Sequence, residues 1–165
     1  MKNATTRARE AAMQLLFEQL FGGDADDSTL RDLIEYPDSD LAMQQIPAAE
    51  EETSSEGLRY IHEVVAGVRE HSSDIDAKIA ENLRGWTLRR LSRVDYAILR
   101  LAVYELLYTG LPAAIVIDEA VNLSKKYSTE RSGAFVNGVL GSIHRKSLRA
   151  SSSLEGSEKG QPENA

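Results

Sequence analysis

The sequence contains no cysteine, and its histidines are few and scattered. Among its 165 residues are His62, His71 and His144, whose spacing matches no H-E-x-x-H zinc motif. The absence of cysteine excludes a disulfide framework, a thiolate zinc centre and a cysteine nucleophile. A chain of this length buries roughly 70% of the surface that it exposes when unfolded, so it needs no such support to fold. We therefore expect no cofactor and no metal site.

Long apolar runs are also missing. No stretch approaches the 18 or so apolar residues that a membrane-spanning helix needs. The basic start of the chain, residues 1–10, is not followed by the apolar region of a signal peptide. We therefore expect a cytoplasmic protein without membrane contact.

Catalytic signatures are absent as well. The sequence has no Walker loop, no dinucleotide-binding glycine pattern and no G-x-S-x-G elbow. An enzyme would have to use Asp118 and Glu119, but adjacent residues on a helix point about 100° apart and do not converge. We expect a non-enzymatic protein with no catalytic residues. The enzymatic alternative stays open until these two side chains are placed.

The acidic net charge of −7 is concentrated in one segment. Residues 24–56 contain eleven acidic residues against Arg31 alone, a charge of −10, so the remainder of the chain sums to +3. A run of this kind is typical of a solvated loop. The sequence therefore describes a mildly basic framework that carries an acidic insert.

Apolar residues recur at helical spacing along the chain, and strands do not alternate with helices. The stripes are as follows: Leu15, Leu16 and Leu20 in a helix over about 6–21; Leu58, Ile61, Val65 and Val68 after a capping box at 53–56; Ile75, Ile79 and Leu83; residues 97–107 after a box at Ser92 and Asp95; and Val136, Val139, Leu140 and Ile143. Pro112 favours a further helix through about Tyr127. The fold class is therefore all-α.

We predict one helical domain over residues 1–150. A first bundle covers about 6–84 and a second about 86–148, with a shared core and with Trp86 at their junction. An acidic loop covers 35–52. The Ser/Glu/Gly/Pro-rich tail, 151–165, is expected to be disordered.

The last predicted helix carries the most informative surface. Projected at 100° per residue, Phe135 lies about 90° from the centre of the apolar stripe, at the rim of the core. The same side collects cations and small residues: Arg131, Gly138, Ser142, Arg145, Lys146 and Arg149. An aromatic ring among cations suits single-stranded RNA, because unstacked bases pack on the ring and cations meet phosphates. The alternative is a Phe135 ring buried between helices beneath an ordinary solvated face.

Four ordered blocks of sequence resemble the NusB family of transcription antitermination factors. The blocks are R-A-R-E-A-A with L-L-F (7–12 and 15–17), L-S-R-V-D and A-I-L-R-L-A-V-Y-E-L (91–95 and 97–106), I-D-E-A-V-N-L-S-K-K-Y (117–127) and F-V-N-G-V-L (135–140). The resemblance covers residues 7–144 without the acidic insert. It implies two small perpendicular three-helix bundles, the second with an extra helix. It also implies binding of single-stranded boxA-type RNA in ribosomal RNA transcripts, together with the ribosomal protein NusE, within an RNA polymerase antitermination complex.

The resemblance also assigns roles to single residues. Lys2, Arg7 and Arg9 would hold phosphates, and Phe135 would contact a base. Arg100 and Lys125 match further basic positions of the family. Arg100 has an alternative role, because it could neutralise a carboxylate inside the bundle.

One acidic residue is assigned to the partner protein. Asp95 would lie on the surface that meets NusE, or would serve only in the box that begins its helix. The chain departs from the family at two places. Thr5 and Thr6 stand where arginines are common, and Arg131 stands where an acidic residue is often found, so Arg131 adds positive charge to the proposed RNA face.

Two other functions remain open. Family members that self-associate through the RNA-binding face make a homodimer possible, and the sparse basic arm with the acidic insert favours a protein–protein adaptor without RNA. A NusB-like RNA-binding module in ribosomal RNA maturation is the second alternative.

Overall fold

The computed structural model describes residues 2–20, 55–85 and 87–158, and it describes residues 2–5, 55 and 155–158 by their backbone alone. The described elements are α1 (Lys2–Gln19), α4 (Ser55–Glu70), α5 (Ser72–Glu81), the 3₁₀ turn η1 (Leu88–Arg90), α6 (Arg93–Tyr108), α7 (Ala113–Tyr127) and α8 (Glu130–Glu158). No strand occurs within these ranges, so the all-α prediction is confirmed for them. None of these helices combines the length and apolar character needed to cross a bilayer. The acidic loop and Trp86 lie outside the described residues.

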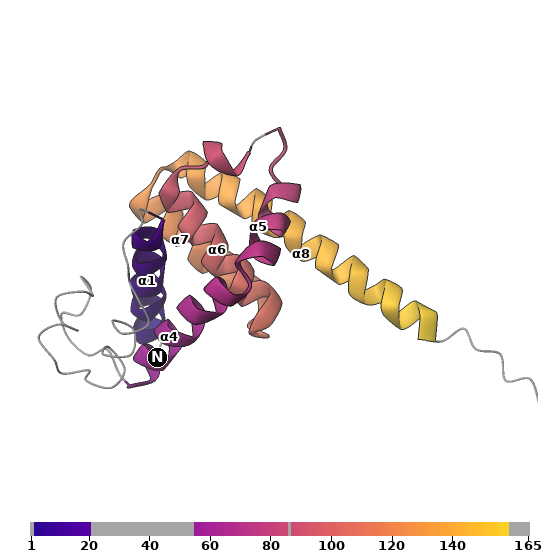
Figure 1. Cartoon of the computed structure of the whole chain (residues 1–165), viewed down its shortest axis with the longest axis horizontal. Helices are drawn as coiled ribbons and strands as arrows, with labels where there is room; N and C mark the ends of the chain where they lie inside the picture. The colour runs from indigo at the N-terminus through magenta and orange to yellow at the C-terminus, as the bar shows by residue number, and fades with distance from the viewer. Residues whose placement is uncertain (1, 21–54, 86, 159–165) are drawn as a thin grey trace, which may run out of the picture.

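Helix α6 lies at the centre of the molecule (Figure 1). It contacts α1, α4, α5, α7 and α8. Its residues are apolar nearly all round, as the centre of a bundle requires, and the side chains from Ala97 to Tyr104 are buried except for Arg100. Ser92 begins the helix by accepting a hydrogen bond from the backbone N–H of Asp95, and Gly110 (φ +70°) lies in the turn that follows it.

The predicted apolar stripes form one continuous core. Leu15 and Leu16 of α1, Ile61 and Val65 of α4, and Ile75 and Ile79 of α5 are buried in it. Val136, Val139, Leu140 and Ile143 of α8 are buried in the same core, as their i, i+3, i+4, i+7 spacing predicts. The two predicted groups of helices therefore share a single interior.

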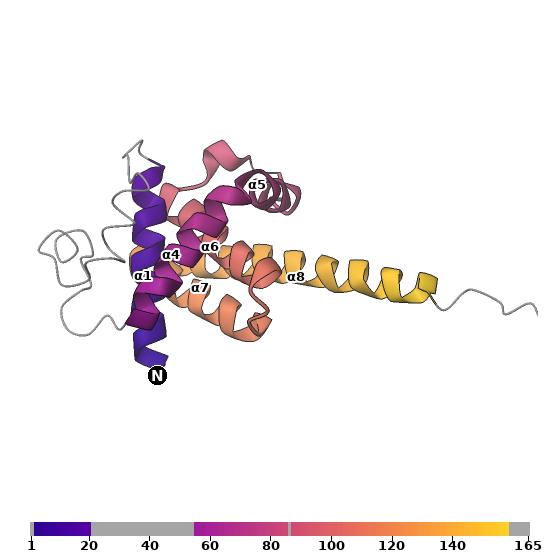
Figure 2. The ribbon, with the colours of Figure 1, turned by 60° about the horizontal axis from the view of Figure 1, so that its bottom comes forward.

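Helix α8 extends beyond the body of the molecule (Figure 2). The prediction of a disordered tail from residue 151 is wrong for residues 151–158, because α8 continues to Glu158. The hydroxyls of Ser151, Ser152 and Ser153 donate hydrogen bonds to the carbonyls four residues earlier. These bonds explain how the segment can be helical, although its serine-rich composition is typical of disorder. Residues 159–165 lie outside the described residues.

A buried ion pair joins α1 to α6. Arg9 Nε donates to Glu105 Oε1 (2.9 Å) and Nη2 donates to Oε2 (2.8 Å), and the two side chains are 4% and 1% exposed. Burial alone would lower the pKa of Arg9, but the hydrogen bond to Glu105 and the charges of Glu105 and Glu119 raise it above its usual value. The prediction that Arg9 holds a phosphate is therefore wrong. Its guanidinium is already occupied inside the protein.

We expect Arg9→Met to lower the free energy of unfolding by about 3–5 kcal/mol, because Glu105 would remain buried without its partner. Urea denaturation followed by circular dichroism measures this loss. The double variant Arg9→Met/Glu105→Leu replaces both charges by apolar groups and should recover most of it. A single variant that costs under about 1 kcal/mol would contradict this reading of the pair.

Candidate nucleic-acid interface

Phe135 lies on the first half of α8, at the rim of the hydrophobic core. Its ring is half-buried and packs against core side chains, so it is not enclosed between helices. It borders two cavities. This placement agrees with the helical projection.

The first cavity lies between the start of α6 and the start of α8, and we call it the α6 pocket. It has a volume of about 290 Å³, and its lining residues are Arg90, Leu91, Ser92, Asp95, Arg131, Ser132 and Phe135. Both arginines are exposed, and Asp95 is 8% exposed. The pocket therefore combines an aromatic wall, two cations and one nearly buried carboxylate.

Asp95 has one unsatisfied oxygen in this pocket. Its Oδ2 accepts a hydrogen bond from Ser132 Oγ of α8 (3.1 Å), whereas its buried Oδ1 has no partner. The backbone N–H of Asp95 donates to Ser92 Oγ at the start of α6, and its carboxylate does not return the bond that a capping box requires. At the start of α6, Asp95 therefore contributes only its backbone N–H, and its carboxylate bonds to α8 instead. A buried carboxylate oxygen without a donor is costly, so a donor from outside would be favourable here.

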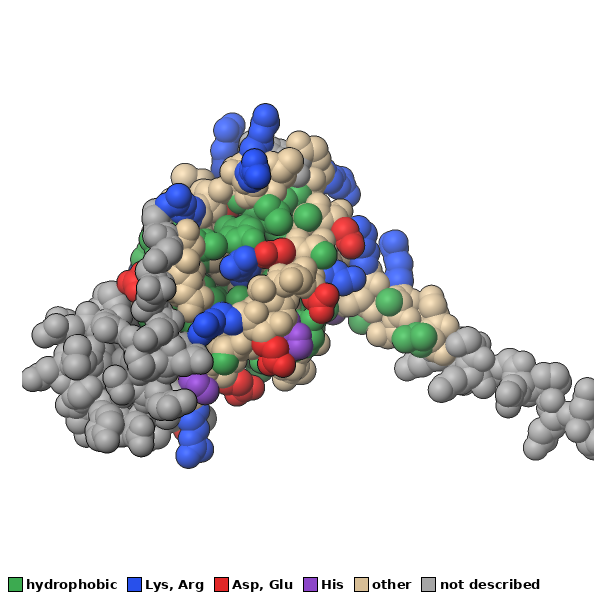
Figure 3. Space-filling view, viewed as in Figure 1, with side chains coloured by type: hydrophobic (Ala, Val, Ile, Leu, Met, Phe, Trp, Pro, Cys, Tyr) green, Lys and Arg blue, Asp and Glu red, His purple; other side chains and the backbone are tan. Residues whose placement is uncertain are grey.

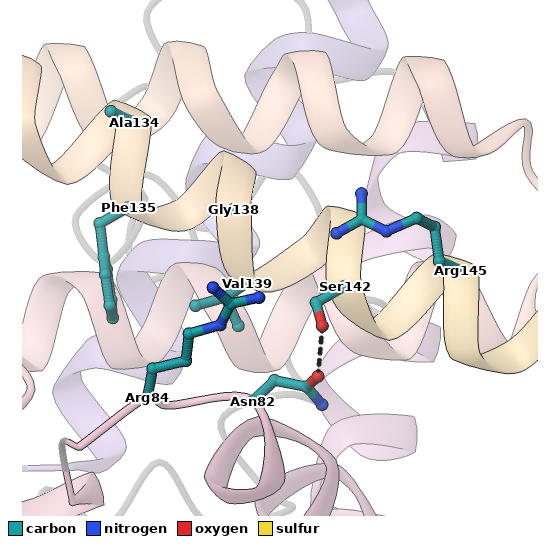
Figure 4. Close-up of a pocket in the computed structure, with 8 residues that line it drawn as sticks. All are labelled: Asn82, Arg84, Ala134, Phe135, Gly138, Val139, Ser142 and Arg145. Carbon is teal, nitrogen blue, oxygen red and sulfur yellow. Dashed lines mark hydrogen bonds between the residues drawn. The ribbon is translucent and has the colours of Figure 1, made fainter.

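The second cavity lies between the end of α5 and α8, and we call it the α5–α8 cleft (Figure 4). It has a volume of about 350 Å³, and its lining residues are Asn82, Arg84, Ala134, Phe135, Gly138, Val139, Ser142 and Arg145. Ser142 Oγ donates to Asn82 Oδ1 (2.6 Å), and this bond joins the two walls. Phe135 therefore lines two cavities that are each bordered by arginines.

Basic side chains outnumber acidic ones around these cavities. Figure 3 shows lysine and arginine side chains along the edge of the molecule above α6 and where α8 leaves the body. Arg84 and Arg90 were not among the residues predicted to bind a ligand. The signal was present in the sequence, because residues 84–93 contain four arginines.

Comparison with known proteins identifies the family. The family model described as "NusB family" matches residues 6–145. The chain belongs to the NusB family. A relative from Clostridium botulinum (strain Kyoto / Type A2), named transcription antitermination protein NusB, is 36% identical over 138 residues, which are 83% of this chain and 96% of the relative. A relative of the same name from Thermus thermophilus is 34% identical over 140 residues, which are 85% of this chain and 89% of the relative.

Solved NusB structures have the same fold. The structure of NusB from T. maritima matches with a TM-score of 0.67 and 34% identity, over 86% of this chain and 90% of that one. A chain in a complex of the antitermination factors NusB and NusE with double-stranded RNA matches with a TM-score of 0.71 and 26% identity, over 88% of this chain and 99% of that one.

The other residues that the NusB resemblance assigns to RNA are more dispersed. Lys125 of α7 is exposed, and its stem lies against α8, with Cγ 3.1 Å from where a β-carbon of Gly133 would be. Arg7 is exposed on α1, and the side chain of Lys2 lies outside the described residues. Thr6, next to Arg7, donates a hydrogen bond to Glu119 of α7. Glu119 and Lys125 are six residues apart on α7. The start of α1, which contains Arg7, therefore meets α7 about 9 Å along the helix from Lys125.

Arg100 takes the second of its two predicted roles. Its guanidinium donates to both carboxylate oxygens of Asp76 on α5 (2.9 and 2.7 Å) and to the hydroxyl of Tyr96 (2.8 Å). Burial, together with the hydrogen bond to Asp76, raises the pKa of Tyr96 to about 12. Arg100 therefore joins α5 to α6, and its RNA-binding role is not supported.

The carboxylates considered for catalysis do not converge. Asp118 is exposed, whereas Glu119 accepts from Thr6 and lies 3.8 Å from Arg9 Nη1. Neither borders the α6 pocket or the α5–α8 cleft. Within the described ranges, no three His, Asp or Glu side chains gather as a metal site would. These contacts give Glu119 a structural role between α1 and α7.

The ion pair of Arg100 with Asp76 predicts a measurable coupling. The side chains are 20% and 24% exposed, so solvent reduces the contribution below that of a fully buried pair. A double-mutant cycle with Arg100→Met and Asp76→Asn should give a coupling free energy of about 1 kcal/mol in urea denaturation. The coupling should decrease at high salt. Additive single losses would show that the pair does not stabilise the contact between α5 and α6.

Proposed function

We propose that this NusB-family protein is a transcription antitermination factor that binds single-stranded boxA-type RNA of ribosomal RNA transcripts together with NusE, within an antitermination complex of RNA polymerase. The observation that carries the proposal is the half-buried Phe135 ring, which lines two cavities bordered by arginines. Its curated relatives are named transcription antitermination protein NusB, and a related chain occurs with NusE and RNA in a solved complex.

The chemistry around Phe135 suits an unpaired nucleotide. A base that stacks on the ring gains about 1–3 kcal/mol, and every base offers such a face. Arg131 and Arg90 border the same pocket and supply positive charge for phosphates. Lys125 adds charge on the neighbouring helix.

The position of Asp95 supports a joint site for RNA and partner. Its carboxylate borders the pocket that Phe135 also borders, and one of its oxygens lacks a donor. An arginine or lysine of NusE at this oxygen would form a charge-assisted hydrogen bond. The protein partner and the RNA would then lie side by side.

Electrostatics predict weak RNA binding by the protein alone. Three phosphate contacts, by Arg90, Arg131 and Lys125, would give a log–log salt slope of about −2 for a single strand, so affinity falls about twentyfold between about 50 and 200 mM salt. Because Arg9 is enclosed in its ion pair, the arm on α1 contributes less than the resemblance implies. We therefore expect strong binding only with NusE present.

Phe135→Ala should weaken binding of a boxA-type RNA by about 5- to 150-fold, because one stacking contact is lost. Fluorescence anisotropy with labelled RNA, with and without NusE, measures this change. Leu148→Ala, an exposed site further along α8, is the matched control and should leave affinity unchanged. Equal affinity of Phe135→Ala and wild type would refute the stacking role. If NusE binds but no RNA binds with or without it, the adaptor function is favoured instead.

Asp95→Asn should weaken the complex with NusE by about 10- to 150-fold, the range expected for a hydrogen bond between charged groups. The backbone of Asp95 still completes the helix start, so the urea midpoint should change little. Isothermal titration calorimetry with NusE measures the affinity. Asp118→Asn removes the same charge from an exposed site on α7 and serves as the control. Equal effects of the two substitutions would mean that only the overall charge matters.

A further inference from the structure

The α5–α8 cleft has a cation near each end. Figure 4 shows the guanidinium of Arg84 extending towards α8 near Val139, and that of Arg145 lying above Ser142. Nη1 of Arg145 is 3.2 Å from where a β-carbon of Gly141 would be, so the side chain folds back along α8 towards Phe135. Both arginines are exposed and available for anions.

The floor of the cleft is open at Gly138. A β-carbon at this position would meet no atom within 4 Å, whereas the neighbouring Val139 is buried in the core. Gly138 follows Phe135 by three residues, so both lie on one side of α8. The glycine therefore leaves free volume directly beside the aromatic ring.

Ser142 gives the middle of the cleft an acceptor. Its hydroxyl hydrogen is donated to Asn82 Oδ1, and Asn82 Nδ2 in turn donates to the carbonyl of Lys78 (2.7 Å). The Ser142 oxygen therefore presents lone pairs to a ligand. A 2′-hydroxyl or a base N–H would satisfy them.

We propose that the α5–α8 cleft is a second RNA subsite, which takes the nucleotide next to the one stacked on Phe135. The proposal rests on the proposed RNA-binding function. Arg84 and Arg145 hold consecutive phosphates, the open floor at Gly138 receives the sugar or base, and Ser142 accepts a hydrogen bond from it. The volume of about 350 Å³ suits one small ligand group. Phe135 itself lines the cleft, so the subsite adjoins the stacking ring.

The salt dependence of RNA binding tests this subsite in the whole chain. Each lost phosphate contact should make the log–log slope shallower by about 0.7, so Arg84→Ala/Arg145→Ala should change it by about 1.4. Affinity at about 50 mM salt should fall on the order of tenfold. The readout is fluorescence anisotropy with a short labelled boxA-type RNA, in the presence and absence of NusE.

Arg59→Ala is the control. Arg59 is an exposed arginine of α4, and it lines neither the cleft nor the α6 pocket. This control should change the log–log slope by less than half of the roughly 0.7 expected for each arginine of the cleft. Equal changes would show a diffuse effect of charge and overturn the subsite. Another outcome is that the double variant loses NusE binding and keeps the wild-type salt slope for RNA in the absence of NusE. That result would also overturn the RNA subsite and would assign the cleft to the protein partner.

Gly138→Leu tests the free volume without changing charge. Leucine is a better helix former than glycine and its β-carbon meets nothing, so the urea midpoint should stay the same or rise. Its side chain should fill the floor and weaken RNA binding at least tenfold. Unchanged affinity would overturn the subsite.

Phe135→Ala in the same titrations separates the two proposals. A loss of affinity with Phe135→Ala, combined with wild-type behaviour of the cleft variants, would leave the proposed function intact and reject the second subsite. Absence of RNA binding by the wild-type protein, with NusE present, would reject both.

Discussion

The buried pair of Arg9 and Glu105 is the constraint on which the rest of the arrangement depends. Two charges removed from water are tolerated only with good geometry, and here both carboxylate oxygens receive an N–H. The pair fixes α1 against the central helix α6, 96 positions away along the chain. It also withdraws one arginine from the surface. Positive charge for an RNA strand would then come mainly from the segment before α6, from α8 and from Lys125 of α7.

The placement of the exposed arginines explains how an acidic protein can present a basic surface. At physiological ionic strength, exposed charges more than about 8 Å apart are largely screened. The net charge of −7 does not describe the lining of the two cavities beside Phe135, which contains four arginines and one acidic residue, Asp95. The arginines that border the two cavities act at short range. Local composition, not the total, decides which ligand these cavities attract.

Helical periodicity predicted the fold well because it depends on neighbouring residues. The stripes of α4, α5 and α8 are buried as expected, and Phe135 lies at the rim where the projection puts it. Periodicity does not predict contacts between residues that are far apart in the sequence. Arg9 is buried beside Glu105, and Arg84 and Phe135 line one cleft because α5 packs against α8. The tail was misjudged because serine hydroxyls bond back to the backbone of α8.

The first turns of α8 link the proposed RNA site at Phe135 to the proposed NusE site at Asp95. Ser132 donates to Asp95 from the first turn of α8, and Phe135 follows it by three residues on the same helix. A donor that satisfies the remaining oxygen of Asp95 would hold this carboxylate, and with it Ser132, in place. The aromatic ring and Arg131 would then be ordered before RNA arrives, so less conformational entropy would be lost when RNA binds. Linkage makes the effect reciprocal: RNA on Phe135 must strengthen partner binding at Asp95 by the same factor.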